Sequence, residues 1–178
     1  MNICINPWCK KRENLDEVER CQNCDTQLLI NNRYRLIKYL CDRGETAATE
    51  LFEIEDLQDP QTPKVLKVLT NNEPKSVNLF QREQDILIRH RHEGIPKGEA
   101  AFSVFTSQGE EFPCLVMEKI AGHNLEQWLK EQGAINQKQA CQWLEQIVKI
   151  LDFIHQQGVL HRDIKPSNIM RRPSAQLV

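Results

Sequence analysis

The sequence lacks the features that mark several protein classes. It contains no run of about eighteen apolar residues, which a helix needs to cross a bilayer. The opening MNICINPWCKKREN has no apolar segment of the kind found in signal peptides. The net charge is only −2, so no strong attraction to nucleic acid or to an anionic membrane is indicated. We therefore expect a cytoplasmic protein with no membrane segment and no nucleic-acid partner.

Cysteine, by contrast, is frequent and unevenly distributed. Four of the seven cysteines lie within the first 24 residues, as the pairs Cys4/Cys9 and Cys21/Cys24. Disulfides are rare in the reducing cytoplasm, whereas two such pairs can present four thiolates to a tetrahedral zinc ion. Few apolar residues accompany them, so a metal would supply folding free energy that burial cannot. We predict a structural zinc knuckle in a prefix of residues 1–27; unrelated thiols on a disordered tail are the alternative.

The pattern beyond this prefix indicates a mixed domain with strands first and helices later. Alternating apolar residues predict strands at 33–40, 50–56 and 64–69, and two more within AAFSVFT and FPCLVMEKI. A 3.6-residue period predicts a helix over 76–90 and, after the fifth strand, a short helix in NLEQWLKEQG and a long one over about 136–157. Gly158 is suited to the position that follows this last helix. No internal repeat or low-complexity tract interrupts the pattern.

Two charged residues do not fit the apolar pattern around them. Lys67 has apolar neighbours on its face of the third strand, and Glu83 lies in the apolar stripe of the 76–90 helix, midway between Leu79 and Leu87. A carboxylate in such a stripe is costly unless it is paired. The two residues could form an ion pair, or both could lie at the edges of their elements in water. The pattern alone does not decide between these alternatives.

The stretch HRDIKPSN, residues 161–168, resembles the catalytic loop of eukaryotic-type protein kinases, and its Lys-Pro-Ser resembles the serine/threonine class. Three further stretches occur in the order found in this family. KVLK resembles the strand that carries the ATP-binding lysine. REQDIL resembles the helix that carries the glutamate partner of that lysine, and LVMEKI resembles the hinge. The resemblance covers about residues 33–178. It implies an α+β fold: a protein-kinase-like N-lobe, with a five-stranded antiparallel sheet and the αC helix, followed by the first helices of the C-lobe.

The same resemblance implies a role for each matching residue. Lys67 would hold the ATP phosphates and Glu83 would hold Lys67. Asp163 would accept the proton of a serine or threonine hydroxyl on a protein substrate, Lys165 would neutralise the γ-phosphate, and Asn168 would ligate magnesium. Further ATP-binding positions implied by the resemblance are Gly44, Leu51, Met117, Glu118 and Ile120. Together with the four cysteines, the predicted cofactors are ATP, Mg²⁺ and structural Zn²⁺.

A four-cysteine knuckle before such a domain resembles the four-cysteine-prefix serine/threonine kinases of cyanobacteria. Two departures from the family pattern stand beside this likeness. GETAATEL replaces the glycine-rich G-x-G-x-x-G-x-V, so that only Gly44 is a glycine; a register through Cys41, Arg43 and Thr46 is the alternative. In addition, the 178 residues contain no Asp-Phe-Gly, activation loop or later C-lobe, so we expect residues 33–178 to be a kinase domain truncated after its catalytic loop.

These observations favour ATP-dependent phosphorylation of protein serine and threonine hydroxyls in signal transduction, with weak or no activity from these 178 residues alone. The main alternative is a non-catalytic pseudokinase fragment that acts as a zinc-bearing binding module. A small-molecule phosphotransferase is less compatible with the Lys-Pro-Ser run and the hinge. A nucleic-acid-binding knuckle is disfavoured because basic and acidic residues alternate in the prefix.

Overall fold

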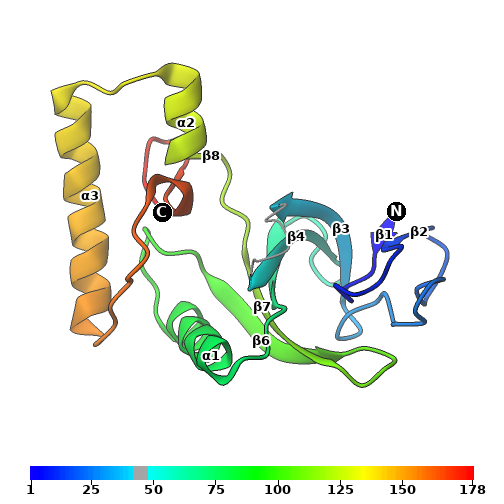
Figure 1. Cartoon of the computed structure of the whole chain (residues 1–178). Coiled ribbons are helices and arrows are strands. Elements are labelled where there is room, and N and C mark those ends of the chain that lie inside the picture. The colour runs from blue at the N-terminus through cyan, green and yellow to red at the C-terminus, as the bar shows by residue number, and fades with distance from the viewer. Residues whose placement is uncertain (42–47) are drawn as a thin grey trace. The chain divides into compact units, whose positions relative to one another are not determined.

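The computed structural model describes residues 1–41 and 48–178, apart from the side chain of Cys41. Its chain divides into two compact units (Figure 1). The first comprises Met1–Arg89 and Lys97–Lys119, and the second comprises His90–Pro96 and Ile120–Val178. Each unit is described by itself below. Among the described residues, none of the helices combines the length and the apolar character that spanning a membrane requires.

The first unit is built on an antiparallel sheet. In the part of the chain that the structure describes, its five strands lie in the order β3, β4, β5, β7, β6. Their bounds are β3 (Tyr34–Cys41), β4 (Thr49–Asp56), β5 (Lys64–Leu69), β6 (Gly98–Phe105) and β7 (Glu111–Glu118). The predicted five-stranded antiparallel sheet is therefore confirmed. Strands β4 and β5, and likewise β6 and β7, are neighbours in the sequence that pair and are joined by turns, as hairpin topology requires.

One helix, α1 (Pro74–Arg89), contacts strands β5, β6 and β7. It buries Phe80 and Leu87, and Glu83 lies between them at helical spacing. Leu79 is 52% exposed, so its assignment to the buried stripe was wrong: the adjacent Phe80 occupies the inward position instead. At the end of the helix Gly98 allows close packing, because a Cβ there would lie 2.8 Å from the carbonyl carbon of Leu87.

The core of the first unit lies under the sheet and includes the N-terminal segment. The inward-facing residues are Leu36, Phe52, Ile54, Leu66, Val68, Phe112, Cys114 and Val116. Ile3 and Ile5 join them, and β1 (Asn2–Ile3), paired with β2 (Glu13–Asn14), lies beside β3. Ile3 and Ile5 of the prefix are therefore part of the sheet's core, whereas Trp8 and Leu15 are 64% and 66% exposed. Beyond Gln27, the Ile30 N–H donates to the Tyr34 carbonyl at 2.8 Å and so connects this segment to the start of β3.

The second unit is mainly helical. Its elements are β8 (His123–Asn124), α2 (Leu125–Gln132), α3 (Gln137–Gln156), the 3₁₀ turn η1 (Pro166–Asn168) and β9 (Met170–Arg171), with β8 and β9 paired. The side chains of Asn124 and Asn136 accept backbone N–H groups and so cap α2 and α3. Gly158 follows the end of α3, as the sequence predicts, and has a φ of +74°. Its N–H donates to the His155 carbonyl.

Candidate functional site

Lys67 and Glu83 form an ion pair between β5 and α1. The Lys67 Nζ lies 2.6 Å from Oε1 and 2.8 Å from Oε2 of Glu83, and 6.0 Å from the centre of the Phe80 ring. Of the two alternatives that the sequence leaves open, the ion pair is therefore confirmed. The lysine is 21% exposed and the glutamate 37%, so water reaches both charged groups.

The surroundings of Lys67 explain how the lysine is held. Leu51 on β4 and Leu115 on β7 pair with it across the sheet, so its aliphatic stem passes between apolar neighbours. A lysine ammonium has three N–H donors, and two point at the carboxylate oxygens of Glu83. Among the residues that the structure describes, no further acceptor is found for the third donor, which can therefore bind an anionic ligand. Gly44, predicted to act beside Leu51, lies outside the described residues.

Met117 and Glu118 end β7, and the segment that follows has its backbone groups partly engaged. The Glu118 N–H donates to the Lys97 carbonyl at 2.9 Å, and the Lys119 N–H donates to the Pro63 carbonyl at 3.1 Å. The Glu118 carboxylate accepts the Lys97 N–H at 2.9 Å. Among the described residues, no backbone partner is found for the N–H of Ile120. Of the three N–H groups from Glu118 to Ile120, two are therefore already used within the protein.

The predicted catalytic residues Asp163, Lys165 and Asn168 lie together in the second unit. The Asp163 carboxylate is 2.9 Å from the Lys165 ammonium, and the Asn168 amide nitrogen donates to it at 2.8 Å and to the Asp163 carbonyl at 3.0 Å. Arg162 adopts a left-handed φ of +61°, and the 3₁₀ turn over Pro166–Asn168 then brings Asn168 back toward Asp163. The loop is a local structure: six residues contain the whole arrangement.

The electrostatics of this loop favour a charged Asp163. Hydrogen bonds with Lys165, and then with Asn168, lower the pKa of the Asp163 carboxyl below its ordinary value. The group is 59% exposed, so a ligand can reach it. Because the Asn168 nitrogen is directed at Asp163, the amide oxygen is the atom that can accept a cation or a donor.

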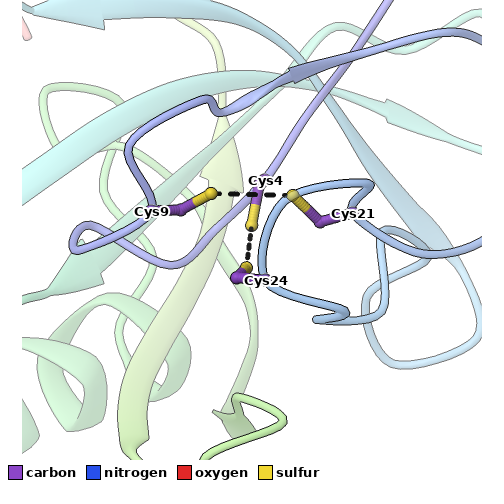
Figure 2. Close-up of side chains that lie close together, drawn as sticks. All are labelled: Cys4, Cys9, Cys21 and Cys24. Carbon is purple, nitrogen blue, oxygen red and sulfur yellow. Dashed lines mark hydrogen bonds between the residues drawn. The ribbon is translucent and has the colours of Figure 1, made fainter.

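Cys4, Cys9, Cys21 and Cys24 converge at one point of the first unit (Figure 2). All four sulfurs lie within 4.8 Å of one another, and the Cys4–Cys24 and Cys9–Cys21 pairs are each 3.6 Å apart. Four thiolates about 2.3 Å from a tetrahedral zinc ion would be separated by about 3.8 Å. The donor set and its spacing fit such an ion, and Leu28 and Val18 cover the cluster.

The cysteines of the cluster differ in the direction in which their surroundings shift the pKa. Burial raises the pKa of the Cys4 and Cys9 thiols, because an isolated thiolate is poorly solvated there. For Cys24, burial acts in the same direction, but hydrogen bonds with Thr26 outweigh it and lower the pKa to about 7. A divalent cation would compensate the charge of four thiolates and release their protons.

Sequence reasoning missed a buried ionic cluster at the start of β5. Lys64 is 2% exposed, and its ammonium lies 2.6 Å from Asp56, 2.9 Å from Glu99 and 3.2 Å from Asp59. Arg33 adds a bidentate contact to Asp56, with both distances 2.6 Å. The available signal was an acidic residue ending one strand and a lysine beginning the next, which a hairpin brings together.

Comparison with known proteins agrees with this geometry. The protein kinase domain family matches residues 49–177. Serine/threonine-protein kinase B of Synechocystis is 35% identical over 99% of this chain and 31% of its own length. Serine/threonine-protein kinase F of the same organism is 29% identical over 98% of this chain and 40% of its own length. Serine/threonine-protein kinase C of that organism is 38% identical over 81% of this chain and 27% of its own length.

The chain thus spans less than half the length of these curated relatives. The matches to kinases B and F nevertheless extend over nearly all of it, the cysteine-bearing segment included. The family match covers the ion pair of Lys67 and Glu83 as well as the loop from Asp163 to Asn168. On these grounds the chain belongs to the protein kinase family.

Proposed function

We propose that this chain carries the nucleotide-binding and hydroxyl-orienting residues of an ATP-dependent serine/threonine protein kinase. The ion pair of Lys67 and Glu83 is the observation that carries the proposal. A lysine on the third strand of the sheet, held by a helix glutamate and with one donor left over, is suited to bind a phosphate oxygen. Family membership and the names of the Synechocystis relatives support the same chemistry.

Each remaining residue has a part in nucleotide binding that its surroundings permit. Leu51 would cover one face of the adenine, because it lies beside Lys67 on the neighbouring strand. Met117 would border the base, and the Glu118 carbonyl and the Ile120 N–H would bond its polar edge. The Ile120 N–H is suited to this because the Glu118 and Lys119 N–H groups are bonded elsewhere. Gly44 would approach the phosphates through its backbone.

Asp163 would orient the substrate hydroxyl rather than act as a strong base. Its lowered pKa keeps it ionised near neutral pH, so it accepts a hydrogen bond from the hydroxyl and takes the proton as the phosphoryl group is transferred. Lys165 would neutralise charge on the γ-phosphate. The Asn168 amide oxygen would hold magnesium, which neutralises phosphate charge when bound. Its amide nitrogen would keep Asp163 in position.

The four-cysteine cluster would bind one structural zinc ion, because its four sulfurs lie within 4.8 Å of one another. Four thiolates complete a tetrahedral coordination sphere, so no position remains for a reacting water. Metal analysis of the purified chain should give one zinc per molecule, lost with Cys21→Ser. A chain that is folded, metal-free and insensitive to chelators would contradict this assignment. Cys141→Ser, at an exposed cysteine of α3, is the matched control.

Calorimetric titration with Mg²⁺–ATP tests the proposed function. The wild-type chain should bind nucleotide, and Lys67→Met should weaken binding by about tenfold or more, the value of a charge-assisted hydrogen bond. Lys75→Met, an exposed lysine of α1, serves as control and should bind normally. Equal affinities for the wild type and Lys67→Met would refute the role of Lys67.

A non-catalytic binding module is the second candidate, because GETAATEL has one glycine where the family pattern has three. Fewer glycines restrict how closely backbone N–H groups approach phosphate. Restoring glycine at Thr46 and Thr49 distinguishes the candidates. A kinase that is limited by this loop should gain nucleotide affinity from the double substitution. A chain that binds no nucleotide before or after it would favour the binding module.

A further inference from the structure

Arg12 connects the four-cysteine segment to the sheet. It lies in the prefix immediately before β2 and is only 13% exposed. Its Nε donates to the Cys4 carbonyl at 2.8 Å and its Nη2 to the Ile5 carbonyl at 3.0 Å. The Cys4 N–H in turn donates to the Arg12 carbonyl at 2.7 Å. The conformation around a predicted metal ligand thereby fixes both the backbone and the side chain of Arg12.

The other side of the same guanidinium contacts the sheet. Nη1 and Nη2 each lie 2.9 Å from one carboxylate oxygen of Glu50 on β4. The guanidinium carbon lies 5.1 Å from the ring centre of Tyr39 on β3 and 5.4 Å from that of Phe52 on β4. Four of the five guanidinium N–H donors are thus engaged, and the cation also stacks on two rings.

These contacts lie next to residues assigned to nucleotide binding. Glu50 precedes Leu51, which pairs with Lys67 across the sheet. A displacement of the Glu50 backbone would be passed to Leu51, because the two residues share a peptide bond. Arg12 also touches both β3 and β4, the strands that border residues 42–47. Arg20, the other prefix arginine, is 58% exposed, and its guanidinium bonds Asp25 within the prefix rather than a residue of the sheet.

We propose that Arg12 is a positioning residue that couples metal occupancy of the four-cysteine site to the nucleotide-binding strands. With metal bound, the backbone around Cys4 is fixed, and Arg12 holds β3 and β4 in register. Without metal, that backbone loosens and the hold on Glu50 weakens. The effect on nucleotide affinity rests on the proposed function, whereas the effect on the strands does not. A lysine cannot substitute, since it lacks the planar fork that bonds two carbonyls and a carboxylate together.

The experiment compares the wild type with Arg12→Lys, Glu50→Gln and the control Arg20→Lys, each with zinc bound and after chelation. Hydrogen exchange in β3 and β4, measured far below the denaturation midpoint, reports the coupling directly. In the wild type and in Arg20→Lys, chelation should speed exchange in both strands and weaken Mg²⁺–ATP binding by about tenfold. In Arg12→Lys and Glu50→Gln, both changes should already be present with zinc bound, and chelation should add little.

The outcomes separate the coupling from the proposed function. Wild-type exchange and affinity in zinc-loaded Arg12→Lys and Glu50→Gln would overturn the role of Arg12. A purely structural role would lower the denaturation midpoint of these variants but leave nucleotide affinity and the response to chelation unchanged, which also overturns it. If the wild type binds no nucleotide, the proposed function fails, and strand exchange still decides the coupling. Glu50→Gln, which leaves the prefix intact, decides the case if Arg12→Lys does not fold.

Discussion

The charged side chains of the two units are organised in different ways. In the first unit, Lys67 and Glu83 are 16 residues apart and come from a strand and a helix. The Lys64 cluster draws on four separate segments, and its central pair, Lys64 and Asp56, is almost fully buried. In the second unit, Asp163, Lys165 and Asn168 lie within six residues and are mostly exposed. The first arrangement needs the tertiary fold, whereas a short loop is sufficient for the second.

The two arrangements are expected to serve different purposes: the buried charges stabilise the fold, and the exposed loop supports the chemistry. Buried charges that depend on several elements are costly to leave unpaired, so their loss should destabilise the first unit. Exposed charges in a local loop contribute little to folding, because water solvates them almost as well as their partners do. The loop of the second unit can therefore place a carboxylate where a substrate reaches it without weakening the fold. The predictions below test this contrast, beginning with the largest effect.

Replacing Lys64 should give the largest loss of stability. Lys64→Met removes the ammonium from Asp56, which is fully buried, and from Glu99, which is 21% exposed. Breaking a buried ion pair in this way costs about 3 kcal/mol. Urea denaturation, with hydrogen exchange in β5 as the probe, measures the change. Lys149→Met, at an exposed lysine paired with Glu145 on α3, should leave the midpoint unchanged. A loss for Lys64→Met no larger than for this control would contradict the contrast.

Acid should weaken the first unit through Asp56. The bidentate contact of Arg33, and then the contact of Lys64, hold the pKa of this carboxyl well below its usual range, despite its burial. Because the folded pKa is lower than the unfolded value of about 3.9, ionised Asp56 contributes stability above that pH. The contribution is lost as pH falls through the folded pKa. The protection of β4 and β5 amides against exchange, relative to the intrinsic rate at each pH, should therefore fall below about pH 4. Asp56→Asn, less stable at pH 7, should show a smaller further change.

The ion pair of Lys67 and Glu83 should give an intermediate effect. Both groups are partly solvated, so Glu83→Gln should cost only about 1 kcal/mol. A double-mutant cycle with Lys67→Met isolates the pair, and the two substitutions together should cost less than the sum of the single ones. Additive losses would show that the two side chains act independently, as charges at separate edges would.

The comparison also explains what the sequence could predict. The five strands of the sheet, α1 and the Asp163 loop follow from local patterns: alternation, helical spacing, and residue types at fixed separation within a few positions. The two-residue strands β1, β2, β8 and β9 carry no such pattern and were not predicted. Lys67 and Glu83 were recognisable because each contradicts the apolar pattern around it. Arg12 and Lys64 gave no such signal. Arg12 stands in a basic run that reads as solvated, and its partner Glu50 lies 38 residues away, so only the tertiary fold makes the contact visible. The Lys64 cluster required the hairpin registers.

Asp163→Asn should have the smallest effect on folding and a large one on chemistry. The carboxylate is exposed, and an asparagine can keep the hydrogen bond with the Asn168 nitrogen while it loses the contact with Lys165 as an ion pair. We therefore expect no measurable shift of the urea midpoint and unchanged exchange in α2 and α3. Nucleotide affinity should also be retained, because Lys67 and Glu83 are untouched.

Any transfer of phosphate from radiolabelled ATP to a serine/threonine substrate should fall by about a hundredfold or more in Asp163→Asn, the usual contribution of a positioned base. A destabilised but catalytically competent Asp163→Asn variant would reverse the assignment, since it would make this loop a structural element like the Lys64 cluster.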